Sequence, residues 1–133
     1  MQRASRAAHI PSDAALRKWA RAAAKSGAVT VRYVGEAEGR RLNREFRGRD
    51  YATNVLSFPY GRSPLAGDIV ICAPVVAREA RAQGKPVKAH HAHMLVHGLL
   101  HLRGFDHERD EEAKAMERRE RAILAKLGFS DPY

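Results

Sequence analysis

The segment HGLLHLRGFDH, residues 97–107, constrains the fold more than any other part of this sequence. The stretch before it opens with Pro86, and its apolar positions follow the period of a helix, which predicts a helix over 86–103. These apolar positions lie on one side: Leu95, Leu99 and Leu102. Gly104 should end the helix, because glycine readily takes the left-handed conformation found just after helix ends. The segment therefore requires a helix, a sharp reversal and a returning loop.

The histidines of this segment have the spacing of metal ligands. A helix places His97 and His101 one turn apart on the same face, where two imidazoles can reach one ion. Such pairs are also common on ordinary helices, but a reversal at Gly104 lets His107 return as a third ligand and leaves one coordination position open. Three imidazoles favour zinc, or a neighbouring transition metal, over magnesium and calcium. The sequence predicts one Zn²⁺ ion per chain on these three histidines.

Other polar residues flank the predicted ligands. His93 lies one turn earlier on the same helical face, so we expect it beside a ligand or facing the substrate. Asp106 either orients a ligand imidazole by accepting its other N–H or caps the helix that follows. His90 and His91 are predicted to be exposed on the helix surface.

The residue after the first ligand bears on the reaction. The histidine spacing matches that of metzincin proteases, in which this residue is the glutamate that activates a zinc-bound water. Here it is Gly98. Peptide hydrolysis, which must also deliver a proton to a poor leaving amine, is therefore disfavoured. Phosphodiester cleavage fits better, because a metal and a nearby cation can share the charge that develops at phosphorus.

The remaining sequence predicts an α+β fold, a single layer of about four strands packed with about five helices, one of them a zincin-like metal-binding helix. Proline cannot donate to a strand ladder, so Pro59 should stop the second of the predicted strands, which pairs like a hairpin with the third. The other predicted helices cover 13–26, 36–46, 74–83 and 110–127, and the strands cover 28–34, 53–60 and 67–72. We expect one domain over residues 1–133.

Charge and cysteine content narrow the class of partner and the compartment. A formal net charge of +9 attracts polyanions such as nucleic acid, although an arginine-rich composition or a need for solubility gives the same balance. The excess positive charge is concentrated over residues 40–49, before the histidine segment. A single Cys72 in an apolar run indicates a buried, reduced thiol and a cytoplasmic protein. No secretion signal or membrane-spanning run is evident, so we expect no membrane partner.

Four motifs together carry a family resemblance. HMLVHGLLHLRGFDH, FRGRDYATNVLSFPY, GDIVIC and LGFSDPY resemble the YbeY family of bacterial rRNA maturation endoribonucleases over about residues 29–133. The histidine pattern matches at every ligand position, whereas the segment between Pro59 and Gly67 is shorter than in many members. The resemblance implies a zinc-dependent, single-strand-specific endoribonuclease for 3′-end maturation of small-subunit (16S) rRNA and ribosome quality control. It also implies the ribosomal small subunit and assembly proteins as partners.

The resemblance also assigns site residues. It places zinc on His97, His101 and His107 and maps the family's functionally important arginine onto Arg47. The planar fork of an arginine beside a metal can grip a phosphate, although a lone arginine at a helix end is usually solvated. The 2′-hydroxyl of RNA can act as an internal nucleophile, and water activated at the metal is the other route.

Single-stranded RNA would need stacking surfaces as well as cations. Tyr51, Phe58 and Tyr60 are candidates, with Phe58 more simply a core residue. Two other functions fit the same residues: a ribosome-assembly RNA-binding factor with a structural zinc, and a metal-dependent hydrolase of another substrate.

Overall fold

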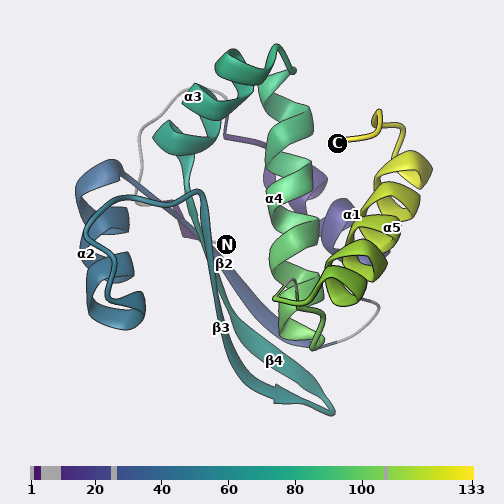
Figure 1. The fold of residues 1–133 in the computed structure, drawn as a ribbon, viewed down its shortest axis with the longest axis horizontal. Coiled ribbons are helices and arrows are strands. Elements are labelled where there is room, and N and C mark those ends of the chain that lie inside the picture. Colours follow the sequence, from purple (N-terminus) through teal and green to yellow (C-terminus); the bar gives the residue numbers. More distant parts are fainter. Residues whose placement is uncertain (1, 4–9, 25–26, 107) are drawn as a thin grey trace.

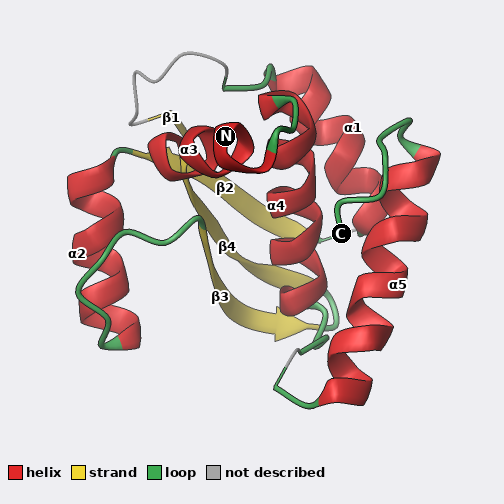
Figure 2. Cartoon of the chain, turned by 45° about the horizontal axis from the view of Figure 1, so that its top comes forward, coloured by secondary structure: helices red, strands yellow, loops and turns green. Residues whose placement is uncertain are grey.

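The fold places one long helix across a face of a mixed sheet (Figures 1 and 2). The computed structural model describes residues 2–3, 10–24, 27–106 and 108–133. The strands are β1 (Gln2–Arg3), β2 (Ala28–Val34), β3 (Val55–Arg62) and β4 (Leu65–Cys72). The helices are α1 (Asp13–Ala23), α2 (Glu36–Arg47), α3 (Ala73–Gln83), α4 (Val87–Leu102) and α5 (Asp110–Lys126). The predicted α+β class is confirmed.

The sheet has the order β1-β2-β4-β3, with β3 antiparallel to β4 and the other pairs parallel. The predicted hairpin pairing is therefore confirmed, but the prediction that its first strand stops at Pro59 is wrong. This strand continues to Arg62, with a register shift between Pro59 and Gly61. It lies at the edge of the sheet, where a proline is tolerated because no strand on the open side needs its missing N–H as a donor.

The residues of strand β4 are buried on both faces because the strand lies between two layers of helices. Ile69 and Ile71 pack in the larger apolar cluster with side chains of α1, α4 and α5. Val70 and Cys72 alternate with them and pack in a smaller cluster beneath α2. This alternation follows from the two-residue period of a strand. Since β4 is held on both faces, it fixes how α4 lies against the sheet.

Helix α4 approaches the sheet closely at two glycines. A Cβ atom on Gly98 would lie 3.1 Å from Cγ2 of Ile69, and one on Gly67 would lie 2.8 Å from Cδ2 of Leu102. Both distances are shorter than ordinary contacts between carbon atoms, so a Cβ at Gly67 would clash, and one at Gly98 would require its neighbours to shift by a few tenths of an ångström. The histidine face of α4 is thereby set at a fixed height above β3 and β4.

The ends of the helices follow local rules. Ser12 caps α1 by accepting a hydrogen bond from the amide of Ala15 at 3.2 Å. This helix ends at Ala23, earlier than predicted, and residues 25–26 of the predicted helix lie outside the described residues. Gly104 follows α4 with a φ of 101°, as predicted from its place after the last turn. Within the described ranges, no helix is long and apolar enough to cross a bilayer.

Candidate metal centre

One face of α4 brings two of the predicted ligands together. The Nε2 atoms of His97 and His101 lie 3.1 Å apart. Two Zn–N bonds of about 2.0–2.1 Å at a tetrahedral angle would place their nitrogens about 3.3 Å apart, so the pair fits one zinc ion with little movement. His107, the third predicted ligand, lies outside the described residues.

A buried carboxylate lies behind this pair. Glu120 of α5 has no exposed surface, and its Oε1 lies 2.5 Å from Nδ1 of His97. Its Oε2 lies 3.0 Å from Nε2 of His93 and also accepts a hydrogen bond from the hydroxyl of Tyr133. If Nδ1 of His97 carries the proton donated to Glu120, the lone pair of Nε2 points towards His101. This carboxylate–histidine arrangement is the one that orients metal-binding imidazoles in proteins.

The same contacts set the charge of Glu120. Burial by itself raises the pKa of a carboxyl group, but hydrogen bonds from His93, His97 and Tyr133 outweigh it and lower the pKa of Glu120 to about 2. Desolvation of the Tyr133 hydroxyl and its bond to Glu120 raise the pKa of that phenol. At neutral pH the carboxylate is therefore ionised and the phenol remains a donor.

The donor atoms of His93, His97 and Glu120 form a second group with metal-site spacing, since they all lie within 4.8 Å of one another. This group could hold a metal ion. His93 and Glu120 are buried, however; His97 borders the same cavity as His101, and His93 borders a different, smaller cavity next to the C-terminal residues. An ion held there would have two buried ligands, whereas an ion on His97 and His101 would face the cavity that both histidines line.

The cavity beside the histidine pair has a volume of about 480 Å³ and also contains Arg47. The guanidinium of Arg47, at the end of α2, donates to the carbonyl oxygen of Ser57 at 2.8 Å and lies 5.5 Å from the ring centre of Phe58. No carboxylate lines the cavity among the residues described. A Cβ on Gly98 would meet Ser57 and the strand beneath, so that position points at the sheet.

The structure corrects the prediction for two other histidines. His90 and His91 are not exposed, because Glu79 of α3 lies against His90 and Tyr33 of β2 lies against His91. Nε2 of His90 lies 2.9 Å from a carboxylate oxygen of Glu79, and Nδ1 of His91 lies 3.4 Å from the hydroxyl of Tyr33. A histidine-rich helix is here buried on most of its circumference, and one ring nitrogen of each of these two imidazoles lies against a polar group on a neighbouring element.

The flanking residues of the predicted site also have defined places. His93 is buried beside the carboxylate that contacts His97, and Asp106 is half-buried in the loop after α4. Sequence reasoning missed Glu120 and Tyr133. A signal for Glu120 was present, because it occupies a position on the apolar face of α5 where a hydrophobic residue is expected. The neighbours on that face are Met116, Ile123 and Leu124.

A histidine pair that opens onto a cavity beside a guanidinium is the arrangement of a metal-dependent hydrolase. The family model described as Endoribonuclease YbeY matches residues 5–128. The chain therefore belongs to the endoribonuclease YbeY family.

Individual relatives agree with this membership. An Endoribonuclease YbeY of Aromatoleum aromaticum is 61% identical, over 95% of this chain and 83% of its own length. One of Alkalilimnicola ehrlichii is 57% identical, over 95% of this chain and 84% of its own length. The solution structure of TM1509 from Thermotoga maritima matches with a TM-score of 0.60 at 24% identity, covering 98% of this chain and 96% of that one. The last similarity supports the fold.

Proposed function

We propose that this chain is a zinc-dependent endoribonuclease that cleaves single-stranded RNA. The observation that carries the proposal is the cavity in which the histidine pair of α4 lies together with the guanidinium of Arg47. Nitrogen donors without a carboxylate in the cavity suit zinc better than magnesium or calcium. In this proposal His97 and His101 hold one ion per chain, and His107 supplies the third ligand.

Each residue of the site has a distinct role in the proposed reaction. Zinc, when bound, supplies Lewis-acid stabilisation of charge on a phosphoryl oxygen. Arg47 is fixed by the Ser57 carbonyl and the ring of Phe58, so its remaining N–H groups can grip a phosphate. Glu120 holds the ring of His97 in one orientation. A cavity without a carboxylate base suits RNA, whose own 2′-hydroxyl is a nucleophile.

The proposed physiological role is 3′-end maturation of small-subunit (16S) rRNA and ribosome quality control, with the ribosomal small subunit and its assembly proteins as partners. Family membership and the net charge of +9 support RNA as the substrate. The buried free thiol of Cys72 supports a reducing, cytoplasmic compartment. Apolar clusters on both faces of one sheet support a single domain over residues 1–133.

A second candidate is an RNA-binding assembly factor with a structural metal, which the largely buried group of His93, His97 and Glu120 favours. It predicts RNA binding without turnover. A hydrolase of peptides, in contrast, would need a carboxylate over the metal, and no described residue of the cavity supplies one.

Single-turnover cleavage of a defined 16S rRNA 3′ precursor, with metal analysis of the same samples, tests the proposal. His101→Ala should abolish cleavage and lower the zinc content, with the fold retained by circular dichroism. Arg47→Ala should slow cleavage by on the order of 100-fold without loss of zinc. Arg44→Ala is the matched control, because it removes the same charge from the same helix at an arginine paired with Asp50. Unchanged cleavage by His101→Ala would refute the proposal.

A further inference from the structure

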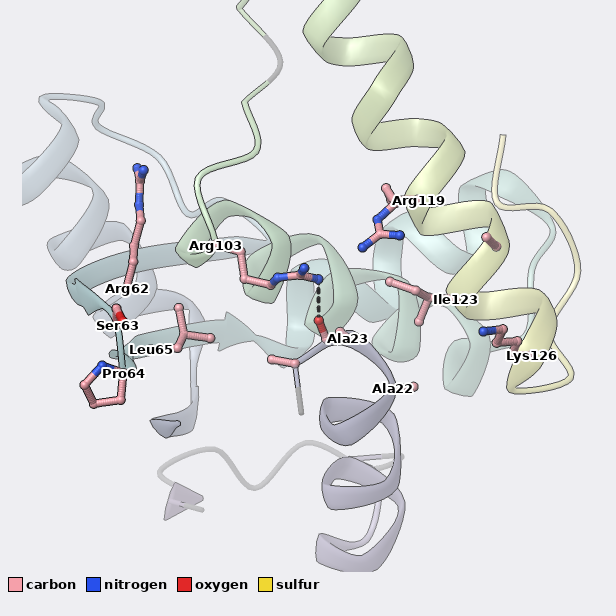
Figure 3. Close-up of a pocket in the computed structure, with 12 residues that line it drawn as sticks. Ala22, Ala23, Arg62, Ser63, Pro64, Leu65, Arg103, Arg119, Ile123 and Lys126 are labelled. Carbon is pink, nitrogen blue, oxygen red and sulfur yellow. Dashed lines mark hydrogen bonds between the residues drawn. The ribbon is translucent and has the colours of Figure 1, made fainter. Parts of the chain in front are cut away.

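A second cavity has a volume of about 670 Å³ and shares no lining residue with the cavity beside the histidine pair. Figure 3 shows the residues that line it. It is enclosed by the end of α1, the turn between β3 and β4, the start of the loop after α4, and α5. Four cationic side chains line it, and no acidic residue is among the lining residues. These cations are Arg62, Arg103, Arg119 and Lys126. We call this space the basic cavity.

Cations with no acidic partner among the described residues line the basic cavity, whereas several arginines of α2 are paired. The arginines of α2 are exposed, but Arg40 and Arg44 pair with Asp50, and Arg41 pairs with Glu38 and Glu45. In the described part of the chain, none of the four cavity cations forms an ion pair. Three of the five arginines over residues 40–49 therefore have acidic partners, and no ion pair is present for Arg47 or Arg49 within the described ranges.

Two of the cavity cations, Arg103 and Arg119, contact the same aromatic ring. Arg103 donates to the carbonyl oxygen of Ala23 at 2.9 Å, which fixes its side chain between α1 and α5 (Figure 3). The guanidinium groups of Arg103 and Arg119 lie 5.7 and 5.9 Å from the ring centre of Phe105. Contacts with one aromatic ring hold both cations near it. A bound anion would relieve the repulsion between them.

The basic cavity is connected to the metal centre along two segments. Strand β3 contributes Pro59 to the cavity beside the histidine pair and Arg62 to the basic cavity. These two residues are separated by about 10 Å along the strand. Arg62 also packs against Gly104, three residues after His101, where a Cβ atom would lie 2.9 Å from its Cζ. An extended polymer that follows the edge strand would therefore meet both cavities.

We propose that the basic cavity binds the phosphate backbone of the single-stranded RNA substrate at nucleotides away from the cleaved bond. This proposal rests on the proposed endoribonuclease function. A chain of regularly spaced phosphates matches the unpaired cations and the alignment of the two cavities along β3, whereas a single small anion would need only one of the cavities. Grooves of this kind are how proteins track single-stranded nucleic acid.

The test compares two triple variants with the same change in net charge. One replaces three of the four cavity cations and leaves Arg103 in place: Arg62→Gln, Arg119→Gln and Lys126→Gln. The matched control replaces paired cations of α2: Arg40→Gln, Arg41→Gln and Arg44→Gln. Binding of a fluorescent 14-nucleotide 2′-O-methyl RNA is measured by anisotropy between 50 and 300 mM salt, so that cleavage does not interfere.

The cavity variant should weaken RNA binding by on the order of tenfold at low salt and reduce the slope of log K against log[salt] by about 2, as expected for three lost phosphate contacts. The control variant should change affinity by less than threefold. An equal effect of both variants, or no effect of the cavity variant, overturns the proposal. The proposal is also overturned if the cavity variant still binds RNA but no longer binds a fluorescent poly-glutamate peptide. That result would indicate an acidic protein partner.

Failure of this binding-site proposal can be distinguished from failure of the proposed endoribonuclease function. If the wild-type protein cleaves unmodified RNA but the two triple variants bind RNA equally well, the endoribonuclease function stands and the proposed binding site is refuted. Wild-type protein that cleaves no RNA would remove the function itself, whatever the binding result. A 4-thiouridine crosslink from a longer RNA to the β3–β4 turn or to α5, lost in the cavity variant, supports the proposal directly.

Discussion

The buried carboxylate of Glu120 offers the most direct quantitative test of the metal centre. Glu120→Gln keeps the shape of the side chain and removes its charge, while His93, His97 and Tyr133 still converge on it. The carboxyl pKa falls from 4.5 to about 2 in the fold, and each pKa unit corresponds to about 1.4 kcal/mol. The ionised group therefore contributes about 3 kcal/mol to the free energy of unfolding at neutral pH. This agrees with the cost of breaking a buried charge pair, about 3–5 kcal/mol.

Urea unfolding of the metal-free protein at pH 7, in the presence of a chelator, measures this contribution. Glu120→Gln should lose about 3 kcal/mol, which with a slope of about 2 kcal/mol/M lowers the midpoint by more than 1 M urea. Tyr133→Phe removes one of the three donors and should lose about 1 kcal/mol. Glu112→Gln, at an exposed position of the same helix, is the control and should lie within about 0.5 kcal/mol of wild type.

The pH dependence has a definite sign. Because the folded pKa of Glu120 is below the unfolded value, its stabilisation is complete above about pH 4.5 and is lost as the pH falls towards 2. The difference between wild type and Glu120→Gln should therefore stay constant from pH 7 to 8 and narrow below pH 4.5. A difference under 0.5 kcal/mol at pH 7, or one that widens on acidification, would refute the reasoning. In the metal-loaded protein, the same variant should bind zinc about 10–100-fold more weakly.

Three further predictions concern other parts of the molecule. Gly98→Ala should lower the free energy of unfolding by about 1–2 kcal/mol in urea, because overpacking against Ile69 at 3.1 Å outweighs the gain in helix propensity; a stabilised variant would contradict this. Burial raises the pKa of the Cys72 thiol, so its reaction with a disulfide reagent at pH 7.5 should be slow until urea unfolds the protein. Removing the metal with a chelator should lower Tm, and added zinc should restore it, unless His101→Ala is present.

The parts of the fold that depend on local sequence could be predicted. The helix over 86–103 and the reversal at Gly104 follow from apolar periodicity and a glycine, and both are confirmed. The facing Nε2 atoms of His97 and His101 follow from the helical period alone. In contrast, whether His90 is exposed depends on the position of α3, which no local pattern encodes.

The role of Glu120 and the grouping of cations at the basic cavity could not be predicted, because both depend on how distant segments pack together. Glu120 acquires its role only when α5 packs against α4, although its place on an apolar face indicated an unusual environment. The balance of charge also changes in three dimensions. Asp50 neutralises arginines of α2, while Arg62, Arg103 and Lys126, far apart in the sequence, meet at one cavity.

The close approach of α4 to the sheet limits which reactions this scaffold can acquire. Introducing the protease glutamate at position 98 would push a carboxylate into Ile69 and Ser57, and the glycine at 67 leaves no compensating space beneath Leu102. A single-substitution library aimed at peptidase activity should therefore return destabilised proteins instead of proteases. A new base would have to enter from the cavity wall just before β3, for example at Thr53 or Asn54, loop residues that line the same cavity as the histidines. Directed evolution of this chain should start there and leave the helix–sheet contact unchanged.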